Sequence, residues 1–254
     1  MRPNRREGPR KAHRNGGICV SDQRGSGQNL AAITNENVEA AYARWAPIYD
    51  KVFRLVLKPG RMAAAEAVNR LGGRVLDVGV GTGLELPMFS AAVKITGVDL
   101  SNPMLEIARK RVADLKLSNV EDLRVMDAMD LEYANDSFDG AVAPYVITTV
   151  PDPVRTMDEM ARVVRPGGEI IIVNHIVNHI GADSGPIAMI ERFMEKRAEK
   201  LGWRPQFPWA IIGDWIDSRP NLELVERRRL NPLGLFTIAR IRKDAGEPTV
   251  SHNV

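Results

Sequence analysis

Apolar and polar positions alternate along residues 73–174 in a way that predicts strands and helices in turn. Short apolar runs of the kind that form buried strands occupy 74–78, 94–98, 121–126, 138–143 and 169–174. Segments with helical periodicity lie between them, at 84–91, 102–116 and 153–164. Strands that alternate with helices indicate a mostly parallel sheet with helices on both faces. The pattern therefore predicts an α/β domain with a doubly wound sheet.

The flanking segments predict further elements. Beyond the alternating region we expect a helix at 186–201 and two strands at 222–229 and 234–241, joined by a turn at 231–234. Ahead of it, residues 36–57 carry an amphipathic helical stripe that Pro47 should interrupt. The apolar and aromatic members of that stripe are Val38, Tyr42, Trp45, Tyr49, Val52 and Val56. Two interpretations stay open: a helix packed on the domain, or a lid or interfacial helix that touches ligand or lipid.

Length and charge suggest how the chain is divided. A chain of 254 residues can bury one full core. We expect a disordered basic tail at 1–33, N-terminal amphipathic or lid helices at 34–72, the main domain at 73–243 and a flexible tail at 244–254. Residues 1–30 hold seven Arg and Lys against two acidic residues. That segment is either a plain basic tail or an electrostatic membrane contact.

Composition excludes several classes of protein. No apolar stretch approaches the roughly 20 residues that cross a bilayer, and no secretory signal is present, so a cytoplasmic protein is expected. The single cysteine, Cys19, excludes an intrachain disulfide and a cysteine-based metal cluster. Four scattered histidines give no metal-ligand pattern, and no metal is expected.

The strongest chemical signal is a glycine-rich turn, VLDVGVGTG, which ends with Gly83, followed by an acid at Asp99 after the next strand. A dinucleotide site would need a third glycine at position 84, which is Leu84. Asp77, just before the turn, would repel a pyrophosphate and attract an ammonium group. Asp99 is placed to bind the hydroxyls of a ribose. The ligand thus has an amine and a ribose but no phosphate, which fits S-adenosylmethionine.

The next strand end adds a third acid. Asp127 can accept a hydrogen bond from the adenine amino group, with Ala128 and Met129 against the ring. Each signal is weak alone, and their order and spacing within a βαβ arrangement make the combination specific.

With these motifs the chain resembles the class I S-adenosylmethionine-dependent methyltransferases. The matching segments are VLDVGVGTG, VDLSNPMLEIAR, MDAMDL, SFDGAVAPYVITTVPDP and ARVVRPGGEIIIVNH. The resemblance implies a seven-stranded, mostly parallel sheet with one antiparallel strand at the edge. It also implies cofactor contacts from Tyr49, Asp77, Gly79, Gly81, Gly83, Asp99, Leu100, Met104, Asp127, Ala128 and Met129.

Longer motifs bear on the methyl acceptor. Family members that methylate nucleic-acid bases carry Asn/Asp-Pro-Pro-aromatic after the fourth strand, whereas this chain has Ala143-Pro144-Tyr145-Val146, so nucleic acid is not expected as a partner. AYARWAPIYDKVF, YVITTVPDP and IIIVNH resemble the soluble bacterial phosphatidylethanolamine N-methyltransferases. The quinone C-methyltransferases are the alternative. The first resemblance implies a phospholipid substrate and a peripheral enzyme that contacts an anionic membrane surface through residues 36–61. The sequence does not indicate an oligomeric state.

The candidate catalytic residues are Tyr145, His175 and His179. Tyr145 can line the methyl channel and hold a cation by its ring face. An alkylammonium must lose a proton before it attacks, so a base or a water relay is expected. The segment IVNH occurs twice in tandem, which leaves two candidate bases. We favour His175 because the preceding strand fixes its place relative to the sheet.

Overall fold

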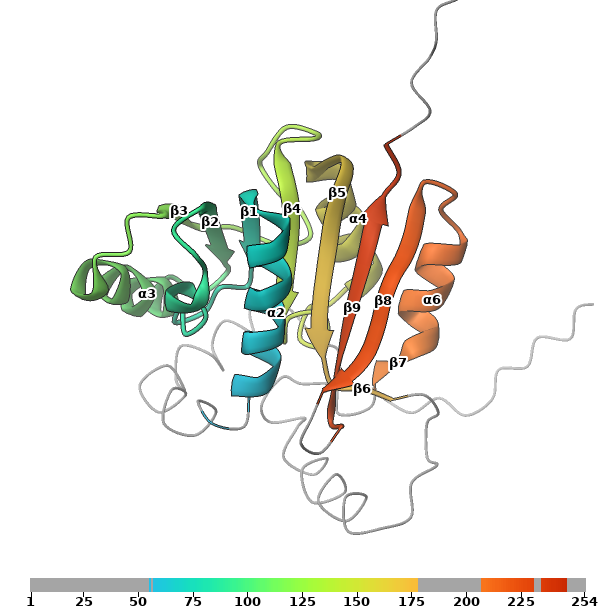
Figure 1. Cartoon of the computed structure of the whole chain (residues 1–254), viewed down its shortest axis with the longest axis horizontal. Coiled ribbons are helices and arrows are strands. Elements are labelled where there is room, and N and C mark those ends of the chain that lie inside the picture. Colours follow the sequence, from blue (N-terminus) through green and yellow to red (C-terminus); the bar gives the residue numbers. More distant parts are fainter. Residues whose placement is uncertain (1–54, 56, 178–206, 231–233, 246–254) are drawn as a thin grey trace, which may run out of the picture. The chain divides into compact units, whose positions relative to one another are not determined.

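The computed structural model describes residue 55 and residues 57–177, 207–230 and 234–245 (Figure 1). The helices are α2 (Lys58–Leu71), the 3-10 helix η1 (Leu86–Met88), α3 (Asn102–Leu115), α4 (Pro153–Val163) and α6 (Trp209–Asp217). The strands are β1 (Gly73–Val78), β2 (Val93–Asp99), β3 (Val120–Val125), β4 (Phe138–Pro144), β5 (Val164–Asn174), β6 (Ile176–Val177), β7 (Phe207–Pro208), β8 (Leu222–Leu230) and β9 (Phe236–Lys243).

Seven strands form one sheet in the order β3-β2-β1-β4-β5-β9-β8. β1 to β5 pair in parallel, and β9 is antiparallel to both β5 and β8. The seven-stranded, mostly parallel sheet is confirmed. The antiparallel strand was expected at the edge and instead lies one place in from it, because β9 inserts between β5 and the edge strand β8.

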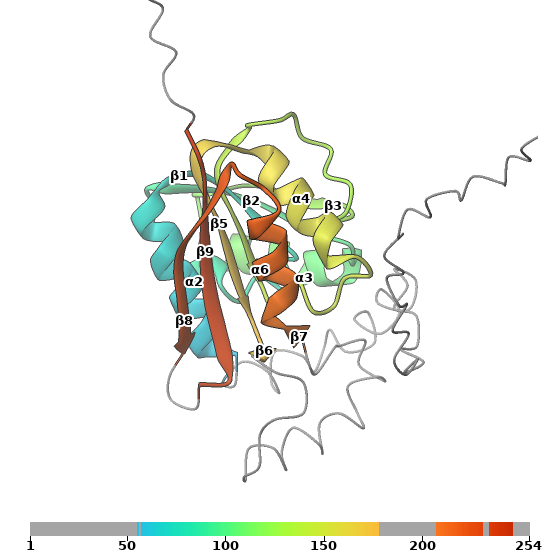
Figure 2. The same ribbon diagram turned by 90° about the vertical axis from the view of Figure 1, so that its right-hand side faces the viewer.

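The sheet has a hydrophobic core on each face. One cluster includes Ala64 and Val68 of α2 with Leu105 of α3, and the other includes Met157 of α4 and Trp215 of α6. In Figure 2, α2 lies on one side of the sheet and α4 and α6 lie on the other. This double cover explains why residues 140–144 of β4 and 170–173 of β5 are buried apolar runs without polar alternation.

Local sequence chemistry explains where the predicted elements were wrong. The helix expected at 84–91 is only the 3-10 turn Leu86–Met88: a helix that began at residue 84 would need an amide hydrogen from Pro87, which has none, and the chain is extended again at Phe89 (ψ 136°). The helix expected at 153–164 is α4, Pro153–Val163, and the strand expected at 169–174 begins earlier than predicted, at Val164. The segment after Pro208 forms α6, a helix that the sequence pattern did not predict.

Several predictions fall outside the described residues. These are the tails, most of the stripe at 36–57, the helix at 186–201, and most of the turn at 231–234. Two candidate site residues, Tyr49 and His179, lie outside them as well. Among the helices that are described, none is long and apolar enough to span a membrane.

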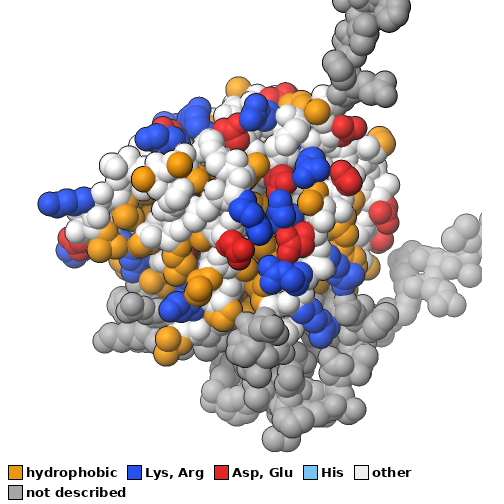
Figure 3. Space-filling view, in the orientation of Figure 1, with side chains coloured by type: hydrophobic (Ala, Val, Ile, Leu, Met, Phe, Trp, Pro, Cys, Tyr) orange, Lys and Arg blue, Asp and Glu red, His pale blue; other side chains and the backbone are white. Residues whose placement is uncertain are grey.

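Ion pairs tie the last strands to the rest of the sheet. Arg240 of β9 bonds Glu169 of β5 at 2.8 Å and Glu226 of β8 at 3.1 Å, and Arg242 reaches Glu169 at 3.3 Å. Figure 3 shows charged side chains of both signs gathered over β9 and β8. Glu169 is buried, so removal of its carboxylate would leave the partly buried Arg240 without the shorter of its two ion pairs, which should destabilise the sheet.

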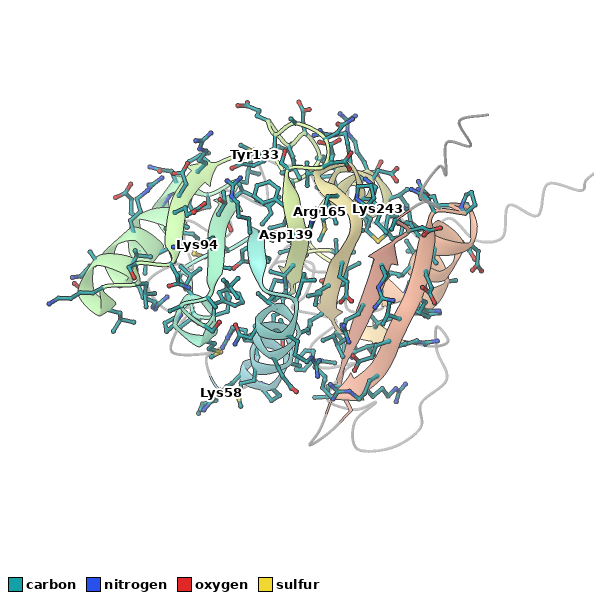
Figure 4. The ribbon with its side chains drawn as sticks, turned by 45° about the horizontal axis from the view of Figure 1, so that its top comes forward. Lys58, Lys94, Tyr133, Asp139, Arg165 and Lys243 are labelled. Atoms are coloured by element: carbon teal, nitrogen blue, oxygen red, sulfur yellow. The ribbon has the colours of Figure 1, made fainter. Side chains whose placement is uncertain are left out.

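A second cluster of polar side chains lies at the edge of the sheet where the parallel strands begin. Asp139 accepts from the Arg74 amide at 2.6 Å and pairs with Arg165 at 2.6 Å. Lys243 donates to the carbonyls of Ala161 and Val164 at the end of α4. Figure 4 shows these labelled side chains at the edge away from Lys58, which begins α2. The carboxyl ends of the parallel strands, at the Lys58 end, are thus left for the site.

Candidate active site

A cavity opens at the carboxyl ends of β1 to β4, where an α/β sheet places its ligands. The glycine turn after β1 forms one wall, and the segments that follow β2, β3 and β4 form the others. It is lined by Arg61, Gly79, Val80, Gly81, Thr82, Leu84, Glu85, Val98, Asp99, Leu100, Ser101, Met104, Met126, Asp127, Ala128, Pro144, Tyr145, Val146, Thr149, Val150 and Pro151.

Backbone amides of the glycine turn are already used in hydrogen bonds to β2 and within the turn. The amides of Gly79 and Val80 donate to the Val98 carbonyl at 2.7 and 3.0 Å. The Gly83 amide donates to Val80, and the Gly81 amide donates to the Asp99 carboxylate at 2.8 Å. A phosphate site needs free amides and the start of a helix, and here only a 3-10 turn follows. The turn therefore suits a ligand without phosphates, as predicted from Asp77 and Leu84.

Two glycines of the turn have different roles. Gly79 has φ +71°, and a Cβ there would lie 2.2 Å from Cγ2 of Val146, so glycine is required for both backbone and space. A Cβ at Gly83 would lie 2.6 Å from Leu86 Cδ1 and 3.2 Å from Ala108 Cβ. Gly83 thus permits close packing against α3, and it does not line the cavity.

Asp99 is held in place by two backbone amides at the end of β2. Its Oδ1 accepts from Ser101 and its Oδ2 accepts from Gly81, both at 2.8 Å. Burial raises the pKa of Asp99, and these two bonds oppose the rise. Each carboxylate oxygen keeps a further lone pair. The carboxylate is therefore rigid and able to accept from a diol.

Asp77 lies at the end of β1, fully buried beneath the turn. Within the described part of the chain, neither carboxyl oxygen of Asp77 has a hydrogen-bond partner. Burial raises its pKa well above the ordinary value, and the neighbouring carboxyls of Glu85 and Asp99 raise it further. A buried carboxyl in this state is stabilised by a cationic ligand group.

The remaining cofactor candidates lie around the cavity. Leu100, Met104, Asp127 and Ala128 all line it. Met129 does not, and its amide instead donates to Oδ1 of Asp127 at 2.8 Å, which orients that carboxylate.

Tyr145 stands directly after β4 with φ +66°, a left-handed conformation that is costly for a bulky residue. Its amide donates to the Val173 carbonyl at 2.7 Å, and its hydroxyl donates to the Leu57 carbonyl at 2.8 Å. The ring packs edge-on against Phe236, with 5.1 Å between centroids. Burial raises the pKa of Tyr145 above its usual range. The phenol is thus a fixed, neutral group in the cavity wall.

His175 follows β5 and is 9% exposed, with its ring 6.5 Å from that of Phe236. It is not among the described residues that line the cavity. The preceding residue, Asn174, accepts from the Thr148 hydroxyl at 2.9 Å. Tyr145 and His175 are thus both neighbours of Phe236.

Two charged residues of the cavity wall were not predicted as site residues. Arg61 falls at the end of the segment 36–61 that was expected to contact a membrane surface, yet it is 4% exposed and lines the cavity. Glu85 lines it too and is 6% exposed. Glu85 lies only two residues after the glycine turn, and an acid at that position is a signal that could have been noticed.

Residues 76–172 match the family model described as a methyltransferase domain. A phosphatidylethanolamine N-methyltransferase from Cereibacter sphaeroides is 44% identical over 206 residues, which make up 81% of this chain and 97% of the relative. The chain belongs to the class I S-adenosylmethionine-dependent methyltransferases. A ubiquinone/menaquinone biosynthesis C-methyltransferase from Geobacter sp. (strain M21) is 35% identical to this methyltransferase over 147 residues, covering 54% of this chain and 63% of the relative.

Solved structures agree on the fold of this methyltransferase. A methyltransferase from Thermotoga maritima, described as a possible histamine N-methyltransferase, matches with a TM-score of 0.60 at 24% identity, over 82% of this chain and 100% of the other. An O-methyltransferase family protein from Burkholderia thailandensis gives 0.68 at 16% identity, over 85% and 64% of the two chains.

The cofactor of this methyltransferase family, S-adenosylmethionine, fits the residues of the cavity. The Asp99 carboxylate, held by two amides, suits its ribose, and Asp127 suits its adenine amine; both residues line the cavity. Asp77 is fully buried beneath the turn and is not among the described residues that line the cavity, so its carboxyl can attract the ammonium group only by its charge, from below the turn. When bound, S-adenosylmethionine supplies a methyl group on a positively charged sulfur. The prediction of this cofactor from the glycine turn is confirmed by the family.

Proposed function

We propose that this methyltransferase transfers methyl groups to the amine of phosphatidylethanolamine, including its mono- and dimethyl forms, on the way to phosphatidylcholine. The observation that carries the proposal is the Cereibacter sphaeroides relative, which matches at 44% identity over 97% of its length. A match of that extent includes the segments that build the acceptor side of the cavity, beyond the cofactor half that all class I members share.

The acceptor side has the groups that this chemistry needs. An alkylammonium has a pKa near that of lysine, about 10.4, and must be neutral to attack. The raised pKa of Tyr145 excludes its phenolate as the base near neutral pH. Tyr145 is therefore assigned to holding the amine by its oxygen lone pairs and ring face. The proton passes to a histidine, His175 in our proposal with His179 as the alternative, directly or through water.

Methyl transfer to nitrogen is an in-line displacement, so alignment and exclusion of water matter most. The two hydrogen bonds of Tyr145 and its strained backbone support a fixed orientation for that ring. Asp77 and Asp99 lie at the ends of β1 and β2, so the carboxyls that we assign to the cofactor are also held in place by the sheet.

We also propose that the enzyme reaches its lipid at an anionic membrane surface through residues 36–61. Most of that segment lies outside the described residues. Its described end supports the proposal: Leu55 is 78% exposed, Lys58 is exposed, and Met62 one turn further on is 54% exposed. Exposed apolar groups beside a cation are the combination that binds at a lipid interface.

Quinone C-methylation is the second candidate, supported by the Geobacter relative at 35% identity. It has less support because that match covers 54% of this chain. Expression in a bacterial host that lacks phosphatidylcholine separates the two. Mono-, di- and trimethylated ethanolamine lipids in the extracted membranes support the first candidate. An altered quinone profile without new lipids contradicts it.

A further inference from the structure

Acidic and basic residues are separated along the edge strand β8. Its first half carries Glu223 and Glu226, and three consecutive arginines follow at 227–229. β8 and β5 are both antiparallel to β9, so β8 runs in the direction of the parallel strands. The arginines therefore lie at the edge of the sheet where those strands end, which is also the edge at which the cavity opens. The helix α2 begins at the same edge and contacts β8 (Figure 1).

The arginines of this strand end are not all neutralised by acids. Arg228 pairs with Glu226 at 2.9 Å, and the same carboxylate pairs with Arg240 at 3.1 Å. Arg229 is exposed, and among the residues that the structure describes no acid pairs with it. Because Glu226 already serves two arginines, the positive charge of Arg229 can attract an anion from outside the domain.

Arg227 is held beside Arg229 on one face of the strand, since residues two apart in a strand point to the same side. Its guanidinium carbon lies 3.9 Å from the centre of the Trp209 ring, so it stacks on the first residue of α6. Partial burial lowers the pKa of Arg227, and the positive charge of Arg229 lowers it further. Like charges held side by side repel each other, and an anion that contacts both removes that repulsion.

Apolar side chains are exposed at the same edge. Leu55 is 78% exposed and Met62 is 54% exposed, close to the start of α2. Arginines, a partly buried tryptophan and exposed apolar groups together are typical of surfaces that lie at a lipid interface. We propose that the end of β8, with Arg227 and Arg229, binds phosphate groups of an anionic membrane surface. This contact adds to that of the N-terminal segment, and it rests on the proposed lipid substrate.

Charge on an edge strand has a simpler use, because it discourages pairing with the edge of another chain. Either sign of charge serves that use, whereas attraction to an anionic surface needs a positive side chain. Arg229→Glu therefore separates the two, since it keeps a charge on the edge strand and reverses its sign. Arg229 is exposed and makes no ion pair with the described residues, so this change should leave the urea midpoint of unfolding unchanged.

Co-sedimentation of the full chain with vesicles of phosphatidylglycerol and phosphatidylcholine at low salt tests the proposal. One basic residue near an anionic surface changes binding by a factor of about five. We therefore expect Arg229→Gln to bind about fivefold more weakly than the wild type, and Arg229→Glu about 25-fold more weakly. Arg229→Lys keeps the charge and should bind within about twofold of the wild type.

Arg70→Gln is the matched control. Arg70 is an exposed arginine in the last turn of α2, at the end of the helix away from this edge, and it pairs with Glu66. The control changes the net charge by the same amount as Arg229→Gln. Because charges far from the surface are screened by salt, it should leave vesicle binding within about twofold of the wild type.

An Arg229→Glu protein that binds the vesicles as tightly as the wild type overturns the proposal. An equal loss of binding in Arg70→Gln overturns it too, because net charge rather than position would then govern binding. Unchanged vesicle binding with lost binding to a single-stranded oligonucleotide would assign the arginines to nucleic acid and overturn it as well. If the expected binding pattern is found but the wild type methylates no lipid amine, the membrane contact is supported and only the proposed acceptor is contradicted.

Discussion

Asp77 and Glu85 place two buried carboxyls next to each other with Arg61 and Arg111 nearby. Burial raises the pKa of Glu85 to about 7, and the two arginines oppose that rise. The pKa of Asp77 is also raised, well above its ordinary value, by burial first and by Glu85 second. The pair therefore holds protons in the folded protein at pH values where the unfolded chain has released them. Cofactor binding supplies a cation that removes this cost.

The first prediction concerns the pH dependence of stability without cofactor. Between the unfolded pKa of about 4.5 and the folded value of about 7, the folded state binds more protons. The free energy of unfolding should therefore fall as pH rises through this window, by on the order of 3 kcal/mol from Glu85 at most. Glu85→Gln should flatten the slope and be the more stable protein at pH 8.

Urea unfolding at pH 5 and pH 8 measures that difference. Glu66→Gln, an exposed acid on α2, is the control and should keep the wild-type slope. A wild-type protein that gains stability between pH 5 and pH 8, or a Glu85→Gln variant with an unchanged slope, would show that the pair is not carrying these protons.

Residues that act within one short motif could be predicted from the sequence. Asp77 and Asp99 come at the ends of two apolar runs, so chain order alone predicted that both lie near the glycine turn, where the structure has them. Arg61 could not be assigned in this way, because it reaches the cavity only through the packing of α2 against the sheet. Charge at a position says nothing of whether the side chain faces solvent or a site.

At the scale of elements, α2 and the end of β4 are fitted to each other. Gly60 lies in the first turn of α2, and a Cβ there would fall 1.9 Å from the Tyr145 hydroxyl oxygen and 2.8 Å from Val173 Cγ1. The missing side chain lets the tyrosine hydroxyl reach the Leu57 carbonyl. The helix thereby fixes the ring that we assign to the acceptor amine.

The second prediction follows from that contact. An alanine in an exposed helix would ordinarily add about 0.5–1 kcal/mol of stability over glycine. Gly60→Ala should instead cost on the order of 1–3 kcal/mol through overpacking, measured by urea unfolding, and should lower kcat by displacing Tyr145. Adding Tyr145→Phe should recover part of the stability, since the nearest clashing atom is gone. A Gly60→Ala protein that is as stable and active as the wild type would refute the fit.

Two elements were not predicted correctly from the sequence pattern, and each has a physical reason. The run 84–91 has helical spacing of apolar residues, yet it forms only a 3-10 turn: Pro87 cannot donate the amide hydrogen bond that a helix beginning at residue 84 needs there, and the chain becomes extended at Phe89. The helix α6 was missed because it has only nine residues and begins directly after Pro208; its buried residues are Ile212, Trp215 and Ile216. The type of sheet depended on the long alternation of strands and helices, and it was predicted correctly.

For the whole molecule, the third prediction is the salt dependence of lipid binding. If residues 36–61 carry the membrane contact, each basic residue near an anionic surface adds roughly 1 kcal/mol at low salt. Vesicles rich in anionic lipid should therefore bind the protein, and raising the salt should release it, as seen by co-sedimentation. Neutral vesicles should bind it weakly at every salt concentration. Equal binding to both vesicle types at all salt concentrations would rule out the electrostatic part.

The central claim is that this methyltransferase uses S-adenosylmethionine to methylate a lipid amine. The most direct measurement incubates the purified full chain with methyl-labelled S-adenosylmethionine and vesicles of phosphatidylethanolamine, then separates the lipids. The account predicts label in mono-, di- or trimethylated phosphatidylethanolamine, and its loss in Asp77→Asn, which removes the charge that binds the cofactor. Lipids that stay unlabelled, while the label passes to a demethylated quinone under the same conditions, would contradict the account.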